Sequence, residues 1–154
     1  MISQIEALRE NRSSLLEQLK DLTAEQLNLT PEGRSNNIIW NLGHMIAVQQ
    51  GICYKRAGLP TLISDDFWHR FKSGSTPRDI ISEGEITSIK QLLIITSDQL
   101  ETDYKKQIFG HYNTWMTRNG VELASIDDGI KFLSFHEGLH SGVIMDIKRS
   151  VTIH

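Results

Sequence analysis

Two histidines stand four residues apart near the C-terminal end of the chain, in the segment His136-Glu137-Gly138-Leu139-His140. On a helix, residues at this spacing lie on one face about one turn apart, so both imidazoles can reach a single ion. Apolar residues such as Leu133 and Ile147 share that face, and we therefore expect both rings to point into the protein core. This pattern predicts part of a metal site.

A third histidine, His44, lies in an earlier segment with helical periodicity and has apolar neighbours such as Trp40 and Val48. A buried imidazole without a partner loses the hydrogen bonds that its nitrogens make with water, so inward histidines need partners. One shared metal ion satisfies all three rings, whereas the alternative is a separate hydrogen bond from each ring to a carbonyl or carboxylate. We predict that His44, His136 and His140 hold a metal ion.

The remaining three of the six histidines carry a weaker signal. His69 follows two aromatic residues, His111 is in a glycine-containing loop and His154 is the last residue, so we expect surface or packing roles. Cys53, the single cysteine, lies nine positions after His44. On an ideal helix that is half a rotation and roughly 13 Å along the axis, so Cys53 should not share the metal.

Two charged residues, Arg12 and Glu137, each fit more than one role. Arg12 interrupts an apolar helical stripe, so we expect it to pair with a carboxylate or to extend into solvent, with an anion-binding cleft as the alternative. Glu137 is next to a predicted ligand and is a candidate general base. It projects about 100° around the helix from His136 and equally fits a solvent-facing position.

Known catalytic motifs fit the sequence poorly. The segment 136–140 matches H-E-x-x-H, but only 14 residues follow it, without a glutamate, and the strands that flank such a site in zinc proteases are missing. A ferritin-like di-iron site needs two Glu-x-x-His copies, and there is one. Neither a G-x-S-x-G elbow nor a glycine-rich phosphate loop occurs.

Four segments with helical periodicity must position these residues. They predict an all-α four-helix bundle with long connections around the third helix, and one domain spanning residues 1–154. A short helical turn is expected at 65–71 in the connection 58–84, and a loop at 110–124. The predicted helices cover 5–22, 36–57, 85–108 and 126–150, with Ser125 capping the last.

Composition excludes several classes of function. The net charge is −3 with a pI near 6.0, which gives no electrostatic footprint for nucleic acid or an anionic membrane. The longest aliphatic run covers residues 92–95, far short of the roughly 20 needed to cross a bilayer. The N-terminus lacks a signal-peptide pattern and one cysteine suits a reducing compartment, so we expect a cytoplasmic protein.

Two segments, Asn36 to His44 and Phe135 to Val143, contain the three histidines that we predict to hold a metal. The first segment resembles the first ligand helix of the DinB/YfiT-like proteins, and the second is similar to the H-x-x-x-H-x-G signature of that family. Ser141 and Val143 stand where many members have Arg and Gln. The order of the motifs matches, and with the helix layout the resemblance covers essentially the whole chain.

The resemblance implies a four-helix bundle in which His44, His136 and His140 hold a divalent metal. We expect zinc or nickel, with iron or manganese as alternatives. The resemblance also implies hydrolase or thiol S-transferase chemistry on a small molecule, such as a low-molecular-weight thiol. It further implies that the protein forms a homodimer. The alternatives are a non-catalytic stress-response or scaffold protein with a structural or vestigial metal site, and a helical dimer whose histidines make only hydrogen bonds.

Overall fold

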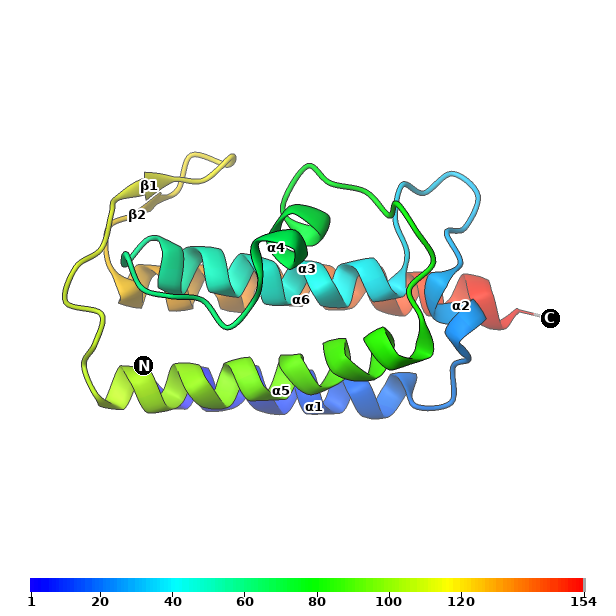
Figure 1. The fold of residues 1–154 in the computed structure, drawn as a ribbon, viewed down its shortest axis with the longest axis horizontal. Helices are drawn as coiled ribbons and strands as arrows, with labels where there is room; N and C mark the ends of the chain where they lie inside the picture. The colour runs from blue at the N-terminus through cyan, green and yellow to red at the C-terminus, as the bar shows by residue number, and fades with distance from the viewer. Residues whose placement is uncertain (154) are drawn as a thin grey trace.

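Four long helices form the body of the protein in a computed structural model that describes residues 1–153 (Figure 1). Helices α1 (Ile2–Leu19) and α6 (Ile126–Thr152) run in one direction, and α3 (Ile38–Gln50) and α5 (Glu83–Lys105) run in the other (Figure 1). Both α1 and α3 pack against α5 and against α6, which closes the bundle. The all-α fold predicted from the sequence is therefore confirmed.

Side-chain caps explain where three of these helices begin. The Asn37 side chain accepts a hydrogen bond from the Trp40 backbone N–H at the start of α3. Ser82 and Glu85 form a reciprocal capping box at the start of α5. Ser125 accepts from the backbone N–H of α6 as predicted, and two aspartates follow it in the first turn.

The connections contain more regular structure than the sequence predicts. The short helix α4 (Asp65–Phe71) was expected, but α2 (Ala24–Asn28) was not, because five residues are too few to show a periodicity. The predicted loop 110–124 contains an antiparallel pair, β1 (Trp115–Met116) and β2 (Glu122–Leu123). Within residues 1–153 no helix is long and apolar enough to span a membrane.

Two glycines, one in α3 and one directly after its last residue, let α4 lie directly on this part of the chain. A Cβ atom on Gly43 would come within 2.5 Å of the Phe71 ring, and one on Gly51 within 2.6 Å of the Trp68 ring. Larger residues at either position would push these rings away. The two glycines therefore fix where the C-terminal end of α4 sits over α3.

The predicted helix 36–57 changes its winding near its end. Regular α-helix stops at Gln50, and a π-helical turn η1 (Gly51–Lys55) follows, in which the Arg56 N–H donates to the Gly51 carbonyl at 3.1 Å. A π turn holds more residues than an α turn and is frequent at functional sites. It alters the direction of the side chains that follow it.

Candidate metal centre

The three histidines singled out in the sequence come together between α3 and α6. Nitrogen atoms of His44, His136 and His140, one from each ring, all lie within 4.8 Å of one another. The ring centroids are 4.4 to 5.1 Å apart. His44 is buried, whereas the two histidines of α6 are partly exposed at the edge of its buried stripe. The cluster is therefore reachable from one side of the bundle.

The ring of His44 is held from two directions. Its Nδ1 donates a hydrogen bond to the Phe71 backbone carbonyl at the end of α4, at 2.8 Å. The Trp40 ring stacks on it, with the centroids 4.6 Å apart and the planes inclined by 12°. Since Nδ1 carries the proton, Nε2 keeps its lone pair, as a metal ligand requires.

An asparagine orients His140 in the same manner. The Asn41 side-chain Oδ1 lies 2.8 Å from Nδ1 of His140. The amide nitrogen of Asn41 donates to the Asn37 carbonyl at 2.7 Å, which fixes Oδ1 as the atom that faces the imidazole. His140 Nδ1 is therefore the donor, and its Nε2 also keeps a lone pair. Such partners hold the tautomer and orientation of metal-ligating histidines.

His136 differs from the other two histidines. Its Nδ1 is buried and has no hydrogen-bond partner among residues 1–153. Leaving a buried polar nitrogen unpaired costs about 1–3 kcal/mol. The unpaired nitrogen, together with two rings whose lone pairs are set by their partners, makes a donor set that fits a divalent metal ion.

The environment keeps all three rings neutral. Burial, followed by the nearby charges of His140 and His44, lowers the pKa of His136 to about 3. Burial and the charge of His44 lower the pKa of His140 to about 4, and burial also lowers the pKa of His44. Near neutral pH no proton must leave before a ligand bond forms, which favours metal binding.

From the sequence, Glu137 was a candidate general base or a solvent-facing residue, and the structure places it in neither position. It is buried, and its carboxylate forms an ion pair with the Arg12 guanidinium, with both oxygens 3.0 Å from Arg12 Nε. Arg12 also donates to the Leu93 carbonyl at 2.7 Å and to Thr96 Oγ1 at 3.0 Å. The carboxylate partner predicted for Arg12 is confirmed. Glu137 neither faces solvent nor is free to act as a general base, because α6 turns it toward α1.

The other histidines and the cysteine stay apart from the cluster. His69 and His111 are exposed, in agreement with surface roles, and His154 lies outside the described residues. Cys53 is buried, which raises the pKa of its thiol far above the usual range. Among residues 1–153 it is not one of the clustered metal-ligand candidates, as its helical position predicts.

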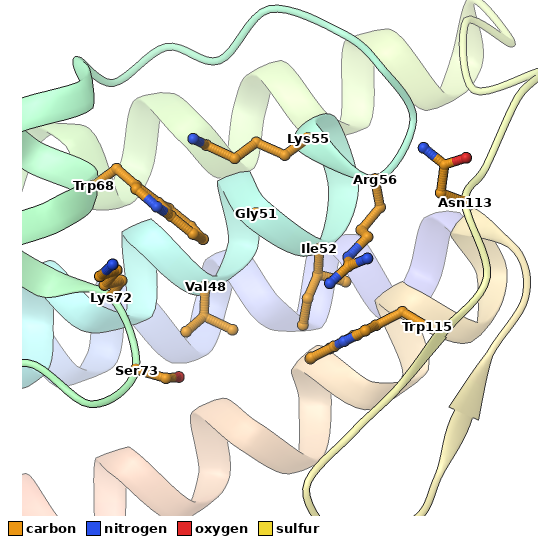
Figure 2. Close-up of a pocket in the computed structure, with 10 residues that line it drawn as sticks. All are labelled: Val48, Gly51, Ile52, Lys55, Arg56, Trp68, Lys72, Ser73, Asn113 and Trp115. Atoms are coloured by element: carbon orange, nitrogen blue, oxygen red, sulfur yellow. The ribbon is translucent and has the colours of Figure 1, made fainter.

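A pocket of about 550 Å³ opens next to the α3–η1 segment (Figure 2), and the residues that line it do not include the three clustered histidines. Val48, four residues after His44 on α3, lies on its floor, and Lys72 in its wall directly follows Phe71, whose carbonyl holds His44. The pocket lies between α3, α4 and the segment before β1. Its walls are Val48, Gly51, Ile52, Lys55, Arg56, Trp68, Lys72, Ser73, Asn113 and Trp115.

Sequence reasoning did not identify the residues that orient the histidines. Asn41 precedes His44 by three positions and so shares a helix face with it, a signal that was present in the sequence. The role of Phe71 depends on its backbone carbonyl, which any residue would supply. The pocket walls come from the long connections, whose packing does not follow from periodicity.

Comparison with known families gives a match that covers most of the chain. The sequence matches the DinB superfamily over residues 7–144, a range that includes all three clustered histidines. No match is found among curated protein sequences. The family match agrees with the helical fold and with the position of the histidine cluster.

Proposed function

The chain belongs to the DinB superfamily, and from this premise and the histidine cluster we propose that it is a metal-dependent enzyme. We propose hydrolase or thiol S-transferase chemistry on a small molecule at a divalent metal held by His44, His136 and His140. Zinc or nickel is the proposed metal, with iron or manganese as alternatives. One observation carries the proposal: three neutral imidazoles converge, and one of them has a buried nitrogen without a partner among residues 1–153.

Three nitrogen ligands leave at least one coordination position open, which is the arrangement of catalytic rather than structural zinc sites. A bound divalent ion at such a site lowers the pKa of a water or thiol and polarises an electrophile. The chain's own residues position the imidazoles: the Phe71 carbonyl and Trp40 hold His44, and Asn41 holds His140.

The adjoining pocket favours an enzyme over a scaffold. A metal that only stabilised the bundle would need no cavity nearby, whereas a pocket of about 550 Å³, within the range of small-molecule sites, begins at Val48, one turn along the helix from His44. A low-molecular-weight thiol is one candidate substrate. We further propose that the protein is cytoplasmic. We also propose that it forms a homodimer, and size-exclusion chromatography with light scattering tests this oligomeric state.

The proposal is tested first by metal content. Protein purified without chelator, or reconstituted with zinc or nickel, should carry about one metal ion per chain. The His136→Ala variant should carry none. Wild-type protein without stoichiometric metal after reconstitution would overturn the proposed metal centre.

Activity is tested on metal-loaded protein with esters, amides and thiols paired with activated acceptors. We expect turnover of at least one class that is lost on chelation and restored by metal. The Lys106→Met variant, altered at an exposed residue outside the pocket, serves as the control and should retain the activity. Stoichiometric metal without turnover across these classes would instead support the scaffold alternative.

A further inference from the structure

The pocket beside the histidine cluster carries a concentrated positive charge. Lys55, Arg56 and Lys72 line it, and within residues 1–153 no aspartate or glutamate does (Figure 2). The whole chain carries a net charge of −3, so this surface opposes the sign of the molecule. A cavity that gathers unlike charge in this way attracts anions.

None of these three cations is neutralised by an ion pair within the described part of the chain, residues 1–153. Two of them rest on aromatic rings instead. Lys55 Nζ lies 4.3 Å from the Trp68 ring centroid, and the Arg56 guanidinium lies 4.8 Å from that of Trp115. These contacts hold the cations in place without cancelling their charge.

The π turn explains why two consecutive cationic side chains reach the same cavity. The bond from the Arg56 N–H to the Gly51 carbonyl closes a five-residue turn, and both Lys55 and Arg56 then line the pocket. Gly51 itself leaves room for Trp68, because a Cβ there would lie 2.6 Å from that ring. The altered winding thus builds one wall of the pocket.

Apolar surface completes the cavity. The rings of Trp68 and Trp115 stand at two sides, and Val48 and Ile52 of the α3–η1 segment form the floor between them (Figure 2). Such a surface accepts a flat, apolar body, while the cations at its rim accept carboxylate or phosphate oxygens.

We propose that this pocket binds a small organic anion with a flat apolar body, an aryl carboxylate or an aryl phosphate. Its anionic group contacts Lys55, Arg56 and Lys72, and its ring lies on Val48 and Ile52, the floor between the two tryptophans. Because Val48 is one turn from His44, the bound anion lies beside the histidine cluster. Its role as a substrate rests on the proposed function, whereas its binding does not.

Isothermal titration calorimetry with 1-naphthoate, 1-naphthyl phosphate and the neutral 1-naphthamide tests the proposal. Each ligand is titrated into metal-loaded protein and into protein dialysed against chelator. We expect at least one anion to bind both forms, and at least tenfold more tightly than the amide. Binding of 1-naphthoate alone assigns a carboxylate ligand, and binding of 1-naphthyl phosphate alone assigns a phosphate ligand.

A charge-neutralising variant locates the anion. Lys55→Met combined with Lys72→Met keeps most of the side-chain length and should weaken anion binding at least tenfold, with circular dichroism confirming the fold. Lys106→Met, at an exposed site away from the pocket, should bind as the wild type does.

Three results would overturn the proposal: equal affinity for amide and anions, unchanged affinity in the double variant, or anion binding that disappears with chelator. The last result would assign the anion to the metal rather than to the cations. If the protein holds no metal and yet binds the anion through the two lysines, the proposed function fails and this inference stands.

Discussion

Helix α6 contributes neighbouring residues to two polar clusters of opposite character. Glu137 enters a network in which its partner, Arg12, donates to the carboxylate, to the Leu93 carbonyl and to Thr96. His136, one position earlier, enters a cluster in which its own buried nitrogen has no partner among residues 1–153. The first cluster is complete within the protein, and the second needs something from outside. The two clusters thus differ in whether the described residues of the protein complete their hydrogen bonding.

The largest effect should come from breaking the complete cluster. Glu137→Gln removes the charge opposite Arg12 and leaves a buried guanidinium uncompensated, which costs about 3–5 kcal/mol of unfolding free energy. Chemical denaturation measures this loss, and metal content should be unchanged. The matched control is the double replacement Arg12→Met with Glu137→Leu, which removes both charges and should cost much less. Equal losses of unfolding free energy in both variants would show that the uncompensated charge of Arg12 does not cause the destabilisation.

The next effect should come from the incomplete cluster. Loss of a residue that only orients a metal ligand weakens metal binding about 10- to 100-fold. Because His136→Leu removes a predicted ligand itself, it should weaken metal binding by more than that. In metal-free protein the same change should leave the unfolding free energy unchanged or raise it, because it removes a buried nitrogen that no group in residues 1–153 pairs with. Metal titration and denaturation measure the two effects. Strong destabilisation of the metal-free protein would mean that His136 has a structural partner.

A smaller effect is expected at the residue that orients His140. Asn41→Leu removes the oxygen that accepts from His140 Nδ1 and should weaken metal binding about 10- to 100-fold. Asn41→Asp keeps an acceptor oxygen and should bind metal more tightly than Asn41→Leu. Competition with a chromogenic chelator gives both affinities. Equal affinities in the two variants would remove the orienting role of the side-chain oxygen.

A last effect, absent at neutral pH and growing as the pH falls, is a pH dependence of the metal-free protein. The pKa values of His136 and His140 are lowered to about 3 and about 4, below the about 6.5 of an unfolded histidine. The unfolded chain therefore binds more protons as the pH falls below 6.5, and stability decreases through that range. Melting temperature followed from pH 7 to pH 4 should fall less steeply for His136→Leu than for the wild type. Parallel curves would contradict the lowered pKa values.

The sequence predicted the helices that carry the candidate site better than it predicted the site's surroundings. Periodicity and capping residues placed His44 and His136 on two long helices, because the burial of an apolar stripe repeats along the chain. Glu137 was misplaced because the helical phase alone did not show that α1 would offer Arg12 as a partner. The pocket around Lys55 was not predicted, since it depends on a π turn and on how α4 docks against Gly51.

The most direct test of the metal centre is a crystal structure of the reconstituted protein, with anomalous diffraction recorded at the metal absorption edge. We predict one anomalous peak about 2.0–2.2 Å from one nitrogen of each of His44, His136 and His140. The pocket side of the peak should be open to solvent or ligand. A structure without a peak at this cluster, in which His136 Nδ1 bonds only to an ordered water, would contradict the account.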